Sequence, residues 1–209
     1  DKTQRISKAV TAFFVEKERG TQVGTIGTKM GLKLSETSEI IFDNVRVPAD
    51  HVIGQVGEGW KLSMEELHES RIMTMAFSLG IADAAVEYAV QYAKTRTAFG
   101  KRLIDHEGLA FKLADMQIRT EPSRCMVYEG ARRICEGKPI GTLSSTTKVF
   151  VAEAAMQTTI DAVQVLGGYG YMKDYPVEKL MRDAKIFCIF DGTTEIQKMI
   201  IGRTLDKMY

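Results

Sequence analysis

The chain has 209 residues, of which 44% are hydrophobic and 26% are charged. This composition is typical of a soluble globular protein, and the length fits one large domain or two small ones. A net charge of +1 provides no general field that would favour nucleic acid or an anionic membrane surface. We find no uninterrupted apolar run long enough to cross a bilayer, so we expect no membrane span.

The cysteines and histidines form no recognisable metal or disulfide pattern. Cys125, Cys135 and Cys188 are scattered, and an odd number argues against a disulfide framework. The cysteine pattern therefore favours a reducing compartment. The histidines lack the spacing of a metalloprotease helix, so we expect no metal site. The chain begins without Met inside strand-like sequence, which predicts a piece of a longer protein.

Residues 1–53 have the pattern of strands and turns. The stretches VTAFFVE and SEIIFDNVRVP are rich in β-branched and aromatic residues, and glycines punctuate them. The glycine-rich segment GQVGEGW follows, and beyond it the apolar period becomes that of a helix. We therefore predict a domain boundary between residues 53 and 54.

Residues 54–209 contain long amphipathic stretches joined by short loops, which predicts antiparallel neighbours as in a four-helix bundle. The first helix should break or bend near Gly80, and Pro122 should kink or split the second. We expect the first helix to begin near Trp60 and the second near Glu107. The third helix should end at Gly167–Gly168, the fourth should begin at Pro176, and the last should begin after Asp191.

The stretch IFDGTTEIQ, residues 189–197, allows two interpretations of Asp191. Asp is a preferred N-cap residue, and most Asp residues at helix starts are caps. The same position suits a base, because a helix N-terminus offers free N–H groups and Gly192 lets a ligand approach the backbone. The pattern alone leaves both roles open.

Two further stretches could bind a phosphate. In AKTRTAFGKRL, Arg96 and Lys101 flank Phe99, and arginine suits bidentate phosphate contact, although a solvated helix end is the simpler interpretation. The glycine cluster at residues 167–170 does not follow a strand, so it is not a Rossmann turn. A helix C-cap explains it equally well.

Taken in order, these motifs resemble the acyl-CoA dehydrogenase family of flavoproteins. The matching stretches are FDNVRVPADHVIGQVGEGW, ESRI…SLGIADAAVEYAVQYAKTRTAFGKRL, DAVQVLGGYGYMKDYPVEKLMRDAK and IFDGTTEIQKMIIGR. The resemblance covers essentially the whole chain. It implies a mainly α fold, in which the end of a middle β-sandwich domain (residues 1–53) precedes a C-terminal four-helix-bundle domain (residues 54–209).

The resemblance also implies an activity: FAD-dependent oxidation of an acyl-CoA thioester to the 2-enoyl-CoA. Members typically form homodimers or homotetramers, share FAD across a subunit interface and pass electrons to electron-transfer flavoprotein. The expected location is the cytoplasm of a bacterium or the mitochondrial matrix of a eukaryote. The alternatives are a catalytically silent assembly module or partner subunit, an oxidase that uses oxygen, and a DNA-associated branch that the net charge disfavours.

Positions that match the family predict the site residues. The FAD contacts expected are Arg96, on the pyrophosphate, and Phe99, His106, Glu107, Gln164, Gly167, Gly168, Thr193 and Glu195. The acyl-CoA contacts expected are His68, Glu69, Ser70, Arg71 and Gly192.

Asp191 falls where most of the family carries its catalytic Glu, and the backbone N–H there helps to bind the thioester carbonyl. Some branches place the Glu at the position of Ser70, which cannot act as a base. Glu107 stands where the family commonly has Gln. We therefore expect Asp191 to be the base, one methylene shorter than Glu, and also the cap of the last helix.

Overall fold

The computed structural model describes residues 5–208. Contacts divide the chain between Leu67 and His68 into two compact units. The long helix α2 (Gly59–Thr95) crosses this division. The domain boundary expected between residues 53 and 54 stays a prediction.

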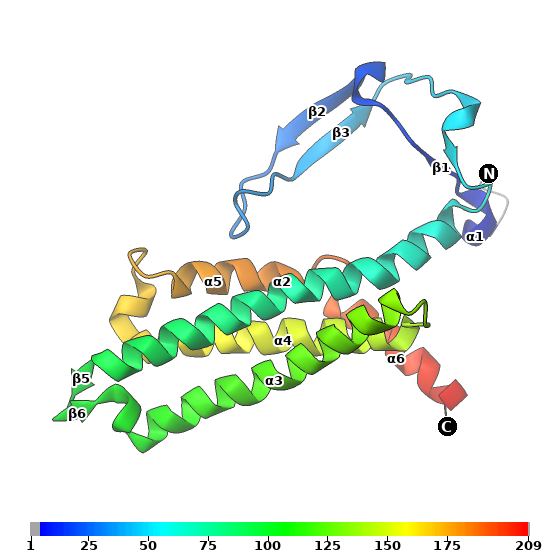
Figure 1. Ribbon diagram of the computed structural model, residues 1–209. Coiled ribbons are helices and arrows are strands. Elements are labelled where there is room, and N and C mark those ends of the chain that lie inside the picture. Colours follow the sequence, from blue (N-terminus) through cyan, green and yellow to red (C-terminus); the bar gives the residue numbers. More distant parts are fainter. Residues whose placement is uncertain (1–4, 209) are drawn as a thin grey trace. The chain divides into compact units, whose positions relative to one another are not determined.

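Short antiparallel ladders dominate the first unit (Figure 1). Its elements before α2 are α1 (Ile6–Ala9), β1 (Ala12–Phe13), η1 (Lys17–Arg19), β2 (Thr21–Ile26), β3 (Ser38–Phe42), η2 (Ala49–His51) and β4 (Val52–Ile53). Strand β2 pairs with β3, and β1 pairs with β4. Apolar side chains such as Val23, Ile40 and Phe42 are exposed on these ladders. A two-stranded ladder is marginally stable alone, which fits a partial β-domain.

Helices make up the second unit, which confirms the mainly α fold with a helical bundle. Besides α2, the elements are β5 (Thr97–Ala98), β6 (Lys101–Arg102), η3 (Leu103–Asp105), α3 (Glu107–Cys135), α4 (Gly141–Leu166), η4 (Gly167–Tyr171), α5 (Val177–Ala184), η5 (Lys185–Cys188) and α6 (Thr194–Met208). Helix α4 contacts α3, α5 and α6. Figure 1 shows the β5–β6 turn at one end of the bundle and α6 at the other.

Small side chains let the helices of the bundle approach closely. Ala85, Ala89 and Ala93 of α2 are fully buried in one core cluster with residues of α3, α4 and α5. At Gly130 of α3, an added Cβ would lie only 2.5 Å from Cδ1 of Ile72 in α2. The Ile72 side chain of α2 therefore packs against the α3 backbone where a larger residue than glycine would not fit.

The predicted break of the first helix and split of the second are wrong, whereas a bend at Gly80 and a kink at Pro122 stay predictions. Helix α2 continues through Gly80 without a break, and α3 continues through Pro122 without being split. A proline inside a helix costs about 3 kcal/mol. Helix α3 buries Met116 before the proline and Val127 after it, and each such side chain contributes about 1.5–3 kcal/mol. Packing on both sides of Pro122 thus outweighs the local penalty.

By length and composition alone, two segments are apolar enough to cross a membrane: Gly59–Thr95 and Gly141–Tyr171. The core helices of a globular bundle pass the same test, and α4 occupies such a central position between α3, α5 and α6. The absence of a membrane span stays a prediction.

Candidate active site

Asp191 lies in the turn between η5 and α6. Its backbone is left-handed, with φ of 54°, and Gly192 follows with φ of 86°. Non-glycine residues adopt this conformation rarely, and Asp and Asn tolerate it best. The two consecutive left-handed residues reverse the chain immediately before α6.

Thr193, and not Asp191, caps α6. The Thr193 side-chain oxygen accepts a hydrogen bond from the N–H of Ile196 at 3.3 Å, and its carbonyl accepts from the N–H of Gln197 at 3.0 Å. The capping role expected of Asp191 is therefore wrong. The physical reason is its left-handed backbone, since an N-cap residue lies in the extended region.

Helix α2 supplies partners for Asp191. The Thr74 hydroxyl donates to Oδ2 of Asp191 at 2.6 Å, and Nε of Arg71 donates to the Asp191 carbonyl at 3.1 Å. Thr74 follows Arg71 by three residues, so both lie on one face of α2. The fully buried Gln197 donates from Nε2 to the carbonyls of Asp191 and Gly192, each at 3.4 Å. The turn is thus held from two helices.

The expected acyl-CoA residues separate into those near this turn and those away from it. Nδ1 of His68 lies 3.3 Å from Nη1 of Arg71 and 3.1 Å from Oγ of Ser144. Burial, and then the Arg71 charge, lowers the pKa of His68, so the ring is neutral near pH 7. Glu69 is exposed. The hydroxyl of Ser70 is buried and has no hydrogen-bond partner in the described part of the chain.

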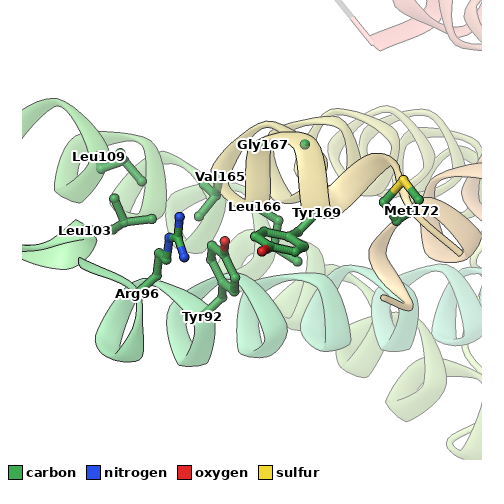
Figure 2. A pocket seen from close by; sticks show the side chains of 10 residues that line it. Tyr92, Arg96, Leu103, Leu109, Val165, Leu166, Gly167, Tyr169 and Met172 are labelled. Atoms are coloured by element: carbon green, nitrogen blue, oxygen red, sulfur yellow. The ribbon is translucent and has the colours of Figure 1, made fainter. Parts of the chain in front are cut away.

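Six of the nine expected FAD residues line two neighbouring cavities at the β5–β6 end of the bundle. One cavity, of about 460 Å³, is lined by Arg96, Gly167 and Gly168 together with Tyr92 and Tyr169 (Figure 2). The second, of about 370 Å³, is lined by Phe99, His106 and Gln164, and three residues line both: Leu103, Leu109 and Val165. Glu107 lines neither cavity and is exposed at the start of α3.

Arg96 is available to an anion. Its Cζ lies 5.7 Å from the ring centroid of Tyr169, a cation–π distance. Figure 2 shows the guanidinium next to Tyr92, whose ring packs against Tyr169 with centroids 6.3 Å apart. Within residues 5–208, Arg96 forms no salt bridge: the ion pairs observed there involve other cations. Stacking on an aromatic face leaves its N–H groups free to donate.

Phe99 and the two glycines leave open surface beside Arg96. Phe99 is 98% exposed and has a left-handed backbone, with φ of 50°. Its ring meets His106 edge-on, with centroids 6.3 Å apart, and Nε2 of His106 lies 3.0 Å from the Ala98 carbonyl. A Cβ at Gly167 or Gly168 would meet no atom within 4 Å. An uncovered aromatic ring beside open backbone suits a planar ligand.

Thr193 and Glu195 lie elsewhere, at the start of α6. They line a third cavity of about 350 Å³, together with Cys188. Hydrogen bonds from its own N–H and from Thr193 lower the pKa of Glu195. Burial raises the pKa of the Cys188 thiol, so this cysteine is a poor nucleophile. In the part of the chain that the structure describes, no group of His, Cys, Asp and Glu could hold a metal ion.

The expected FAD residues thus form two groups that lie far apart along α2. Arg71 contacts the Asp191 turn, and α2 continues as unbroken helix from there to Thr95, next to Arg96. At about 1.5 Å per residue, this length of helix spans about 36 Å.

Sequence reasoning missed four side chains that shape these sites. Thr74 and Gln197 hold the Asp191 turn, and Tyr92 and Tyr169 flank Arg96. Thr74 could have been found, because it lies one turn after the matched Arg71 on the same helix face. No local signal predicts the other three.

The known proteins that match this chain belong to one family. The family model "Acyl-CoA dehydrogenase, C-terminal domain" matches residues 57–205. An acyl-CoA dehydrogenase of Bacillus subtilis is 47% identical over 94% of this chain and 52% of its own length. The chain therefore spans about half the length of the curated relatives it matches.

Solved structures share the fold. Butyryl-CoA dehydrogenase from Megasphaera elsdenii has a TM-score of 0.94 and 42% identity, over 95% of this chain and 52% of its own. A structure described as the electron transferring flavoprotein of Acidaminococcus fermentans has a TM-score of 0.95 and 41% identity, over 98% of this chain and 54% of its own. The chain belongs to the acyl-CoA dehydrogenase family, with the family's C-terminal domain at residues 57–205.

Proposed function

We propose that the protein to which this chain belongs oxidises an acyl-CoA thioester to the 2-enoyl-CoA with the help of bound FAD. The family membership and the names of the relatives support this activity. Asp191 removes the α-proton of the thioester. FAD, when bound, supplies the acceptor for the β-hydride and so the oxidising power.

The observation that carries the proposal is how the Asp191 carboxylate is held. Thr74 fixes Oδ2, while Oδ1 has no hydrogen-bond partner among residues 5–208. The backbone N–H of Asp191 likewise makes no hydrogen bond within the described residues. A base oxygen and an N–H donor therefore remain available at one residue. The N–H polarises the thioester carbonyl, where negative charge develops, while Oδ1 takes the proton.

Asp191 has about 1.5 Å less reach than a Glu would have. Misplacement of a reacting group by about 1 Å can cost about a hundredfold in rate, so the position of the shorter carboxylate matters. The hydrogen bonds from Arg71 and Gln197 to the Asp191 carbonyl fix the turn before substrate binds. This preorganisation favours a site built for Asp over one in which Asp is a loss of function.

The cavities at the β5–β6 end fit the charged and planar parts of a flavin dinucleotide. Arg96 has no carboxylate partner among the described residues and suits the pyrophosphate. The backbone of Gly167 and Gly168 allows close approach, and Phe99 offers an uncovered ring. The carboxylate of Glu195, near the other site, would accept hydrogen bonds from ribose hydroxyls and would repel phosphate.

A single dinucleotide is too short to reach from Arg96 to Asp191 along about 36 Å of helix. Two copies of the chain, each contributing one end, would complete a shared site, which supports a homodimer or homotetramer. We further propose electron-transfer flavoprotein as the electron acceptor, and a location in the bacterial cytoplasm or the mitochondrial matrix.

Flavin absorbance of the purified whole protein, followed by anaerobic titration with acyl-CoA, tests the proposal. Straight-chain, branched and ring thioesters belong in the panel, because a displaced base would change substrate preference. We expect a yellow protein that at least one thioester bleaches. Bound flavin that no thioester bleaches would favour the silent assembly module, and absence of flavin would refute the cofactor assignment.

A further inference from the structure

Three tyrosine rings pack against one another beside the cavity that Arg96 lines. Tyr92 belongs to α2, Tyr169 to η4, and Tyr175 to the segment before α5. The ring centroids of Tyr169 and Tyr175 are 5.3 Å apart, and each lies 6.3 Å from the centroid of Tyr92. The rings meet at tilted or edge-on angles, which aromatic pairs favour. This tyrosine cluster therefore fastens η4 and the segment before α5 to the end of α2.

The tyrosine cluster holds both sides of the cavity. Arg96 comes one turn after Tyr92, and its N–H donates to the Tyr92 carbonyl at 2.9 Å. The open backbone of Gly167 and Gly168 directly precedes Tyr169. All five of these residues line the cavity of about 460 Å³ (Figure 2). Packing of Tyr92 on Tyr169 therefore fixes the guanidinium side of the cavity relative to its glycine side.

Tyr169 is the contact that restrains the Arg96 side chain. The Arg96 backbone is fixed on both sides, because its N–H donates to Tyr92 and its carbonyl accepts from the N–H of Leu103 at 2.8 Å. The guanidinium lies over the Tyr169 ring, with Cζ 5.7 Å from the centroid. Within residues 5–208, no salt bridge of Arg96 competes with this contact. The ring therefore decides where the guanidinium lies before a ligand arrives.

The charges in the cavity suit an anion. In the part of the chain that the structure describes, no acidic residue lines it. Burial raises the pKa of Tyr92, and the Arg96 charge opposes this effect only in part. The Tyr92 hydroxyl therefore stays protonated near pH 7, and it places no negative charge beside Arg96.

We propose that Tyr169 is a positioning residue that holds the Arg96 guanidinium at the cavity wall and so sets the affinity of the protein for the pyrophosphate of FAD. A guanidinium over an aromatic face keeps the donors at its edge available, where a phosphate oxygen can accept from them. Holding the side chain in advance also reduces the rotamer freedom that is lost on binding. This inference rests on the proposed function, in which Arg96 binds FAD.

The FAD affinity of the whole protein, prepared free of flavin, tests the inference. Tyr169→Leu removes the ring face and should weaken FAD binding about two- to fivefold, the usual contribution of an exposed cation–π contact. Tyr169→Phe keeps a ring face and should bind FAD as tightly as the wild type. Tyr171→Leu is the matched control and should also bind normally, because Tyr171 lies in the same turn, is 84% exposed and does not line the cavity. Wild-type affinity in Tyr169→Leu, or equal weakening in Tyr169→Phe, would overturn the proposal.

A double-mutant cycle shows whether Tyr169 acts through Arg96. If it does, Tyr169→Leu should cause no further loss of FAD affinity once Arg96→Ala is present. Losses that multiply independently would show that Tyr169 contributes by packing alone, and they would overturn the positioning role. Tyr169 is 46% exposed, so the Leu variant should fold, and Tyr169→Met replaces it if its melting temperature falls.

A second readout needs no flavin. The ring current of Tyr169 shifts the NMR signals of the Arg96 Cδ protons, so Tyr169→Leu should move these signals and Tyr169→Phe should leave them nearly unchanged. Unmoved signals in Tyr169→Leu would overturn the contact itself. If the wild-type protein binds no FAD, the proposed function fails, whereas the NMR comparison still decides whether Tyr169 holds Arg96. Inorganic pyrophosphate then replaces FAD as the anion in the double-mutant cycle.

Discussion

Gly192→Ala perturbs the turn that presents the proposed base. Gly192 has φ of 86°, a conformation that costs about 1–2 kcal/mol for a residue with a Cβ. The new Cβ would also lie 2.4 Å from Nε2 of Gln197, so this buried side chain must move. Moving it breaks its hydrogen bonds to the Asp191 and Gly192 carbonyls, at about 1–3 kcal/mol for buried groups left unpaired.

Gly137→Ala separates the two costs. Gly137 has φ of 64°, but a Cβ there would meet no atom within 4 Å. It should therefore lose only the backbone contribution of about 1–2 kcal/mol, whereas Gly192→Ala should lose about 2–5 kcal/mol in total. The difference measures how tightly Gln197 holds the turn.

Chemical denaturation of the whole protein at a fixed flavin concentration gives the loss in unfolding free energy. Single-turnover flavin bleaching gives the effect on the site, and we expect about a hundredfold slower bleaching if Asp191 shifts by about 1 Å. Equal destabilisation of the two variants, with normal bleaching in Gly192→Ala, would refute the contact between the turn and Gln197 as a determinant of the site.

Three further predictions test other parts of the account. Arg96→Ala should lower FAD occupancy of the purified protein more than Lys101→Ala, because it removes a bidentate phosphate contact instead of a solvated point charge; equal flavin content would make Arg96 a surface residue. Thr74→Val should slow bleaching about tenfold, because the Asp191 carboxylate loses the hydrogen bond that fixes its position. Thr95→Val is the control and should not slow bleaching, since the Thr95 hydroxyl donates to backbone carbonyls of α2. Similar rates in the two variants would argue against a role for the hydrogen bond between Thr74 and Asp191. Burial lowers the pKa of His68, so the unfolded chain takes up this proton first as the pH falls below 6.5, and stability falls with it. His68→Gln should therefore lose less stability than the wild type between about pH 7 and about pH 5 in thermal denaturation. An identical pH dependence would contradict a neutral, half-buried ring in the folded protein.

The fold was largely predictable because helix periodicity and small residues are local signals. The alanines of α2 face the core as their spacing predicts, and Gly167 ends α4. Pro122 misled the prediction because its local penalty is visible in the sequence, whereas the burial of Met116 and Val127 that outweighs it depends on α2 and α4.

Sequence reasoning predicted which positions form the site, but it did not predict how their side chains contact one another. Asp191, Thr193 and Thr194 are all capping residue types. The left-handed backbone at Asp191 excludes this residue, and the hydrogen bond from Ile196 identifies Thr193 as the cap. The partners of Asp191 on α2 lie 117 and 120 residues away in sequence, so no local pattern reports them. The roles assigned to Arg96 came from family resemblance, and the stacking that keeps its donors free came from the structure.

The central claim is that Asp191 removes the α-proton, and the reductive half-reaction of Asp191→Asn tests it most directly. Asn is nearly isosteric with Asp, and Thr193 caps α6, so the variant should fold and bind flavin normally. We expect acyl-CoA still to bind while anaerobic bleaching slows by about a hundredfold to ten-thousandfold. Asp191→Glu should keep bleaching measurable, because it retains a carboxylate. Bleaching of the Asn variant at the wild-type rate would contradict the assignment of Asp191 as the base.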